Sequence, residues 1–112
     1  MQREVKKLLL DIHEAGTAIQ QFIEGKELSD YVESDLLSSA VERKFEIIGE
    51  ALTRIRQTDE EVLEQISDYR KIIGFRNVLA HGYDAVSDET VWEISGESLD
   101  KLLEDVDRLY WG

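Results

Sequence analysis

Two residue types are missing from this chain of 112 residues, cysteine and proline. Without cysteine, the chain has no disulfide framework, no zinc ribbon and no thiol nucleophile. A chain of this length would carry about five or six prolines at average usage, and proline is excluded most strongly from helix interiors. The composition therefore favours a mostly helical protein. The missing thiols are compatible with a reducing cytoplasm, which is where we expect the protein.

Long apolar runs are missing as well. No run approaches the ~20 residues of a membrane-spanning helix, and the apolar stretch at residues 8–10 ends at once at Asp11. The N-terminus mixes Glu4 among its basic residues, unlike a signal peptide. We therefore expect no membrane contact. With 42% hydrophobic residues, the chain can bury a core as one domain over residues 1–112.

Basic residues are few, with 13 Lys and Arg against 25 Asp and Glu, a net charge of −12. Proteins that bind nucleic acid broadly through charge need clustered basic residues, so we expect no DNA binding. The charge is uneven, however. Residues 43–76 hold seven basic and seven acidic residues, while residues 1–42 have a net charge of −5 and residues 77–112 of −7. Broad coating of RNA is excluded, but a locally positive cleft on an acidic body is not.

Apolar residues recur at intervals of three and four along four stretches, as they do on helices with one buried face. The stretches are residues 2–24, a second from near 29–34 to 57, a third from 58 to 82, and a fourth from 87 to 110. No stretch alternates apolar and polar residues as a strand does. The sequence therefore predicts an all-α fold, an up-and-down bundle of four to five helices.

Polar residues suggest where these helices begin. Thr58 with Glu61 forms a capping-box pattern, and Ser87 resembles another N-cap, followed by acids in the first turn. The third region is either one helix or a short helix followed by a long one, recapped at residues 67–68. Gly49 lies in mid-helix, where glycine costs about 1 kcal/mol relative to alanine. We expect another helix to approach closely there.

Most catalytic templates are absent: there is no glycine-rich phosphate loop, no Gly-x-Ser-x-Gly and no His-Glu-x-x-His. The two histidines are His13 and His81. Because His13 follows the core position Ile12, we interpret it as a surface or packing residue. The acids at 42, 46 and 50 are typical of a solvated helix face rather than a metal site, so we expect neither metal nor cofactor.

One segment, residues 74–83, combines groups that carry chemistry: Arg76, Asn77, His81 and Tyr83 stand beside the glycine at 82. Asn77 and His81 are four residues apart and share a helix face. Arg76 and His81 are separated by ~140° around an ideal helix. They could reach one ligand if the helix frays at residue 82 or if a groove lies between them, or they could pair with a second subunit across a two-fold axis.

An arginine beside a histidine suits phosphodiester chemistry. The guanidinium of Arg76 can hold a phosphate and stabilise the charge of the transition state. The imidazole of His81 can take a proton from a ribose 2′-OH or give one to the leaving oxygen. The plain alternative is a chance pairing, with His81 favoured by the dipole at a helix end and Tyr83 only an aromatic residue at the rim.

The segment from Arg76 to Tyr83 resembles the Arg-x4-His-x-Tyr signature of HepT-like toxins of the HEPN superfamily. Residues 42–51 resemble the second helix of that family, and residues 73–77 its run into the active-site helix. The resemblance extends over nearly the whole chain. It implies an all-α HEPN-like domain that forms a two-fold homodimer, with the Arg and His of both subunits lining one cleft.

For function, the resemblance implies a metal-independent endoribonuclease, the toxin of a type VII-like toxin–antitoxin system. Arg76 would bind the scissile phosphate of an RNA substrate, His81 would act as general acid or base, and Asn77 would orient either group. The cognate minimal nucleotidyltransferase antitoxin would neutralise the toxin by AMPylation of Tyr83. A different hypothesis is a non-catalytic, nucleotide-binding interaction subunit of a nucleotidyltransferase complex, which the acidity of the chain favours.

Overall fold

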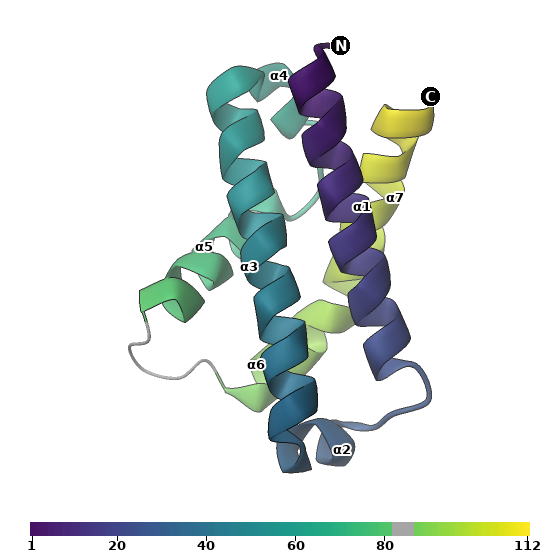
Figure 1. The fold of residues 1–112 in the computed structure, drawn as a ribbon, viewed down its shortest axis with the longest axis vertical. Coiled ribbons are helices and arrows are strands. Elements are labelled where there is room, and N and C mark those ends of the chain that lie inside the picture. The colour runs from purple at the N-terminus through teal and green to yellow at the C-terminus, as the bar shows by residue number, and fades with distance from the viewer. Residues whose placement is uncertain (82–86) are drawn as a thin grey trace.

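The computed structural model describes residues 1–81 and 87–112, and of Ala80 and His81 it describes the backbone alone. All regular structure in these residues is helical, which confirms the all-α class (Figure 1). The elements are α1 (Arg3–Ile23), α2 (Leu28–Glu33), α3 (Asp35–Thr58), α4 (Glu60–Leu63), α5 (Tyr69–His81), α6 (Asp88–Glu93), a π-helical turn η1 (Ile94–Ser98) and α7 (Leu99–Trp111).

The two longest helices, α1 and α3, lie side by side and run in opposite directions (Figure 1). Helix α5 packs on α3 and helix α7 packs on α1. The short helix α2 lies between α1 and α3 in the chain, at the lower end of the bundle in Figure 1. None of the helices in the described part of the chain is long and apolar enough to cross a membrane.

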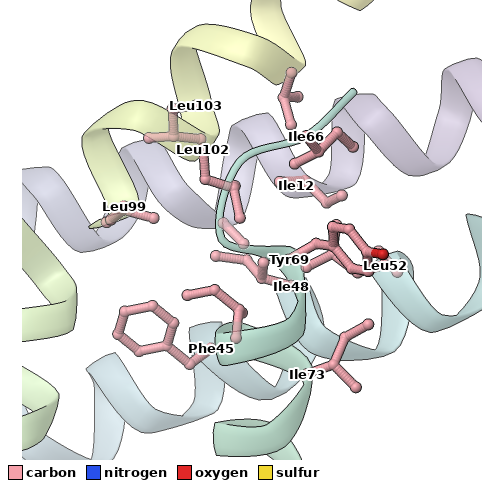
Figure 2. Packing of buried hydrophobic residues seen from close by; sticks show 14 of the residues in the cluster. Ile12, Phe45, Ile48, Leu52, Ile66, Tyr69, Ile73, Leu99, Leu102 and Leu103 are labelled. Carbon is pink, nitrogen blue, oxygen red and sulfur yellow. The ribbon is translucent and has the colours of Figure 1, made fainter. Parts of the chain in front are cut away.

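The core lies where the four longer helices meet, and Figure 2 shows several of its side chains from close by. Its largest fully buried members are Tyr31, Phe45, Leu9, Ile12, Ile19, Ile48, Leu52, Ile55, Leu63, Ile66, Ile72 and Leu99. Except for Tyr31, these positions belong to the apolar stripes that the sequence shows. The apolar spacing of three and four residues therefore predicted the buried faces correctly, because this spacing places residues on one face of a helix.

The start of the third region differs from the expectation. The N-cap residue is Asp59, whose carboxylate accepts a hydrogen bond from the backbone N–H of Val62 at 3.3 Å. The hydroxyl of Thr58 instead donates to the backbone carbonyl of Arg54, one turn back in α3. The predicted capping box on Thr58 is therefore wrong by one residue, since Thr58 ends α3. The region then divides into the short α4 and the longer α5, the second of the two possibilities left open.

The fourth region is not one continuous helix. Ser87 caps α6 as expected, its hydroxyl accepting from the N–H of Thr90 at 3.2 Å. The helix is then interrupted at Gly96, whose backbone angles (φ −89°, ψ −110°) are not helical, and a π-helical turn leads into α7. Apolar spacing on either side continues, so the sequence pattern alone did not show the interruption.

Candidate active site

Helix α5 carries the motif found in the sequence. Arg76 and Asn77 lie in its second half, and His81 is its last residue. The expected helix end at residue 82 and the motif tyrosine, Tyr83, lie outside the described residues, as does the side chain of His81. The structure therefore places the backbone of Arg76, Asn77 and His81 on one helix, and the side chains of the first two.

Two contacts fix α5 against the rest of the bundle. At its start, the backbone N–H of Ser67 donates to the carboxylate of Asp105 on α7 at 2.8 Å. In its second half, the ring of Phe75 meets the ring of Phe45 on α3 edge to face, with centroids 5.2 Å apart. Such an aromatic pair adds ~1 kcal/mol to the burial of its area. The residue next to Arg76 is thus held in the core.

Arg76 itself is half-buried and its side chain begins directly over Gly49 of α3. A Cβ atom at position 49 would overlap the Cβ of Arg76 and would lie 2.6 Å from its Cγ. The expectation of a close helix approach at Gly49 is therefore confirmed. Farther out, the guanidinium donates a hydrogen bond to the side-chain carbonyl oxygen of Asn77 at 3.2 Å.

The charge of Arg76 is not neutralised by a carboxylate among the side chains that the structure describes. Arg43, Arg54 and Arg108 each pair with an acid of their own helix, at 3.3, 3.0 and 2.7 Å respectively. Within residues 1–79 and 87–112, whose side chains are described, no such pair involves Arg76, whose neighbour Asn77 offers an uncharged oxygen. A half-buried, unneutralised guanidinium is suited to an anionic ligand such as a phosphate.

The charge along α5 has the same sign throughout. The helix contains Arg70, Lys71 and Arg76 and no acidic residue. The guanidinium of Arg70 lies over the ring of Tyr69, 4.9 Å from its centroid, and Lys71 reaches the hydroxyl of Ser98 at 3.4 Å. In a chain with a net charge of −12, this helix is a local exception. Of the basic residues expected to line a cleft, Arg43 and Arg54 of α3 contribute less, because each is paired.

The outer face of α5 is uncovered in the single chain. Gly74 has no atom within 4 Å of the place where a Cβ would stand, and the side chain of Val78 is 40% exposed. Asn77 is exposed between them. An apolar side chain beside a glycine on an exposed face leaves room for another helix.

The acids at 42, 46 and 50 do not form a cluster of ligands. Glu46 and Glu50 pair with Arg43 and Arg54, respectively. Burial, together with Asp88 and Glu46, raises the pKa of Glu42 above its ordinary value. No group of three metal-ligating side chains occurs in the described part of the chain.

His13 packs between helices, as one of the two interpretations had it. Its Nδ1 lies 2.7 Å from a carboxylate oxygen of Asp107, which joins α1 to α7. The contact is part-buried and belongs to the α1–α7 packing, not to the motif helix.

Comparison with known proteins identifies the family of the chain. The sequence pattern of the ribonuclease HepT-like family matches residues 12–109. The chain belongs to the HepT-like ribonuclease family. Among the family's relatives, "Putative RNase MJ1380" of Methanocaldococcus jannaschii is 29% identical over 105 residues, which cover 94% of this chain and 95% of that protein.

Two further relatives carry similar names. "Putative RNase MJ1216" of the same organism is 28% identical, over 96% of this chain and 88% of its own length. "Putative RNase TTE0752" of Caldanaerobacter subterraneus is 28% identical, over 78% of this chain and 77% of its own length. No solved structure matches the HepT-like chain at a significant level. The family and these names together indicate a function of the ribonuclease type.

Proposed function

We propose that this HepT-like protein is a metal-independent endoribonuclease whose site is built from Arg76, Asn77 and His81. The observation that carries the proposal is the state of Arg76: half-buried, without a carboxylate partner among the described side chains, and on a helix with no acidic residue. Buried cations are usually paired, so a half-buried cation without a carboxylate partner among the described side chains favours, in a ribonuclease family, a phosphate as its ligand.

The chemistry needs two groups. Arg76 binds the scissile phosphate and stabilises the negative charge that grows on its oxygens as the 2′-oxygen attacks. His81 takes the proton from the 2′-OH or supplies one to the 5′-oxygen when its bond to phosphorus breaks. The products are a 2′,3′-cyclic phosphate and a free 5′-hydroxyl. Asn77, hydrogen-bonded to Arg76, orients the guanidinium or the imidazole.

A two-fold homodimer would complete the site. The uncovered face of α5, with Gly74 and the exposed Val78, lies next to the motif and would form the contact between the two subunits. In a two-fold arrangement the same surface serves both subunits, and both copies of Arg76 and His81 would then line one cleft. Two copies of α5 side by side would bring together six basic side chains and would attract RNA to a body that is otherwise acidic.

The nucleophile can be tested with a matched pair of oligonucleotides in the presence of a chelator. One is all RNA, and the other carries a single 2′-deoxyribose at the cleaved position, which is first mapped with the RNA. We expect cleavage of the first and none of the second at that position, because the attacking oxygen is missing. Equal cleavage of both would exclude the 2′-OH as nucleophile.

We further propose that the protein is the toxin of a type VII-like toxin–antitoxin system. Its cognate nucleotidyltransferase would transfer AMP from ATP to the Tyr83 hydroxyl and release pyrophosphate. The support is the family resemblance and the position of Tyr83, two residues beyond the end of α5. An adenylate there adds a bulky negative group close in sequence to the motif, which would compete with RNA for Arg76.

The modification has its own test. The intact mass after incubation with the partner and ATP should rise in steps of one AMP. Tyr83→Phe should abolish the increase, while Tyr110→Phe, which alters a tyrosine in the last turn of α7, should leave it unchanged. Full modification of the Tyr83→Phe variant would assign the acceptor elsewhere.

The acidity of the chain supports a second candidate, a nucleotide-binding subunit that does not cleave RNA. In that case Arg76 would hold a nucleotide phosphate for a partner nucleotidyltransferase. Binding of ATP by the purified complex, lost in Arg76→Ala, together with intact RNA in the oligonucleotide assay, would favour this candidate over the nuclease.

A further inference from the structure

Gly49 lies in the middle of α3, where α5 crosses it. A Cβ atom there would overlap the Cβ of Arg76 and would come within 2.6 Å of its Cγ and 3.5 Å of its Cδ. The first three carbons of the Arg76 side chain therefore run along the surface that the glycine leaves open. These atoms are not the far end of a flexible chain, because Cβ is fixed by the backbone of α5 and Cγ by one torsion.

Among the described residues, neither Gly74 nor Gly16 makes a comparable contact with a residue of the motif. Gly74, on α5 itself, has nothing within 4 Å of its would-be Cβ. Gly16 on α1 also lies at a close helix crossing, but its would-be Cβ meets the side chain of Leu103 on α7, at 2.5 Å from Cδ2. Position 49 is thus a glycine whose missing side chain makes room for a residue of the motif.

The residues next to this contact also hold α5 against α3. Phe45, one turn before Gly49 on α3, packs edge to face on Phe75, the residue before Arg76. An added atom at position 49 cannot be absorbed by moving α5 away without separating these rings, which lie in the core. Because the Cβ of Arg76 moves only with the backbone of α5, relief of the overlap needs a local shift of α5 at Arg76, which redirects the rest of the arginine side chain.

We infer that Gly49 is a positioning residue for Arg76: by letting the arginine stem lie against the backbone of α3, it sets where the guanidinium stands relative to Asn77 and to the end of α5. The inference rests on the proposed function in one respect, that Arg76 binds the scissile phosphate. A change at position 49 then acts on the reaction through the position of Arg76, in addition to any effect on the stability of the bundle.

The experiment compares Gly49→Ala with Gly16→Ala as the matched control. Both replace a mid-helix glycine at a close crossing, and both gain the same helix propensity. Cleavage of an RNA oligonucleotide is measured for each variant under conditions in which far-UV circular dichroism shows the folded protein. We expect kcat/KM to fall by about tenfold to a hundredfold in Gly49→Ala and by less than about twofold in Gly16→Ala. Equal losses in the two variants would overturn the inference.

A second readout separates positioning from general damage. Affinity for an uncleavable 2′-deoxy oligonucleotide should fall in Gly49→Ala and in Arg76→Ala, and the double variant should bind no more weakly than Arg76→Ala alone. Two groups that act through one contact are non-additive. Additive losses would mean that position 49 acts by another route, and would contradict the inference.

A third readout does not depend on activity. The side-chain Nε–Hε NMR signal of Arg76, assigned by its absence in Arg76→Lys, should move in Gly49→Ala and stay in Gly16→Ala. If the wild-type protein cleaves no RNA and yet this signal moves, the proposed function fails while the placement of Arg76 by Gly49 stands. An unmoved signal would overturn the inference whatever the activity.

Gly49→Ala could also fail to fold, and a compensating variant covers that outcome. Gly49→Ala/Arg76→Gly removes the side chain that the new methyl group would meet. If the single variant is unfolded and the double variant is as stable as Arg76→Gly, the overlap with the arginine stem is confirmed. If both are unfolded, the contact at position 49 is not with Arg76 and the inference is overturned.

Discussion

The carboxylate of Asp105 on α7 accepts the backbone N–H of Ser67, the residue two positions before α5 begins, at 2.8 Å. A second bond comes from Arg108, one turn on in α7, at 2.7 Å. Burial alone would raise the pKa of Asp105, but the hydrogen bonds from Ser67 and Arg108 outweigh it and hold the pKa below its ordinary value. One charged side chain thus ties the start of the motif helix to the C-terminal helix.

This bond predicts how stability depends on pH. Because the pKa of Asp105 is lower in the folded protein than in the unfolded chain, its contribution is present above about pH 4 and is lost as the pH falls through the folded pKa. We expect Asp105→Asn to lower the free energy of unfolding by about 1 kcal/mol at pH 7. In urea titrations from pH 7 to pH 3, the difference between wild type and variant should shrink.

Asp100→Asn is the control for this prediction. Asp100 is an exposed residue of the same helix, and its carboxylate accepts a hydrogen bond from Gln20 on α1 at 2.9 Å. An exposed contact of this kind should change stability by no more than about 0.5 kcal/mol. A pH-independent effect of Asp105→Asn, or one no larger than that of Asp100→Asn, would contradict the role given to Asp105.

For the hydroxyl of Tyr31 we expect the reverse of the Asp105→Asn result: its removal should not lower stability. The residue is 1% exposed, and its hydroxyl has no hydrogen-bond partner among the described residues. Burial, with the carboxylates of Glu42 and Asp88, raises the pKa of this phenol. A buried polar group without a partner costs about 1–3 kcal/mol. Tyr31→Phe should therefore leave thermal stability unchanged or raise it.

Tyr69→Phe is the comparison for Tyr31→Phe. The hydroxyl of Tyr69 donates to the carboxylate of Glu64 at 3.2 Å, so its removal should cost about 0.5–1 kcal/mol. Both changes remove one phenolic oxygen from a buried ring. A loss of stability in Tyr31→Phe as large as that in Tyr69→Phe would show that the Tyr31 hydroxyl is hydrogen-bonded in solution.

The positive charge of α5 predicts a salt-dependent affinity for RNA. Lys71 is exposed on α5, whereas Lys101 is exposed on α7 and pairs with Glu97 at 3.2 Å. If α5 faces the RNA, Lys71→Ala should weaken binding and reduce the slope of log affinity against log salt by about 0.7. Lys101→Ala should do neither. Fluorescence anisotropy with an uncleavable oligonucleotide at several salt concentrations checks both, and an equal response of the two variants would place the RNA elsewhere.

The parts of the fold that sequence predicted are those set by apolar spacing and by steric need. Periods of three and four gave the buried faces of α1, α3, α5 and α7, because only helices bury such a pattern. Gly49 predicted a close helix crossing, because a glycine in the middle of a helix destabilises that helix and is explained by close packing of another helix on it. The crossing residue was not predictable, since nothing local in the sequence pairs Gly49 with Arg76.

Helix boundaries were less predictable, because they depend on competition between neighbouring groups. Thr58 and Asp59 are both favourable N-cap residues. Asp59 caps α4, because the Thr58 hydroxyl is hydrogen-bonded to the carbonyl of Arg54 in α3. Gly96 interrupts the last helix although the apolar pattern continues through it. Within the candidate site, Arg76 and Asn77 are neighbours in sequence, and the structure adds a hydrogen bond between their side chains, while their roles stay predictions. The placement of the His81 and Tyr83 side chains stays a prediction.

Arg76 and His81 are proposed to form a ribonuclease site that needs no metal. The most direct measurement is the rate at which purified protein cleaves RNA in excess chelator, compared with His81→Ala and with His13→Ala, the other histidine of the chain. We expect cleavage by the wild type, a loss of about a hundredfold or more in His81→Ala, and little change in His13→Ala. Equal rates for the wild type and His81→Ala would contradict it.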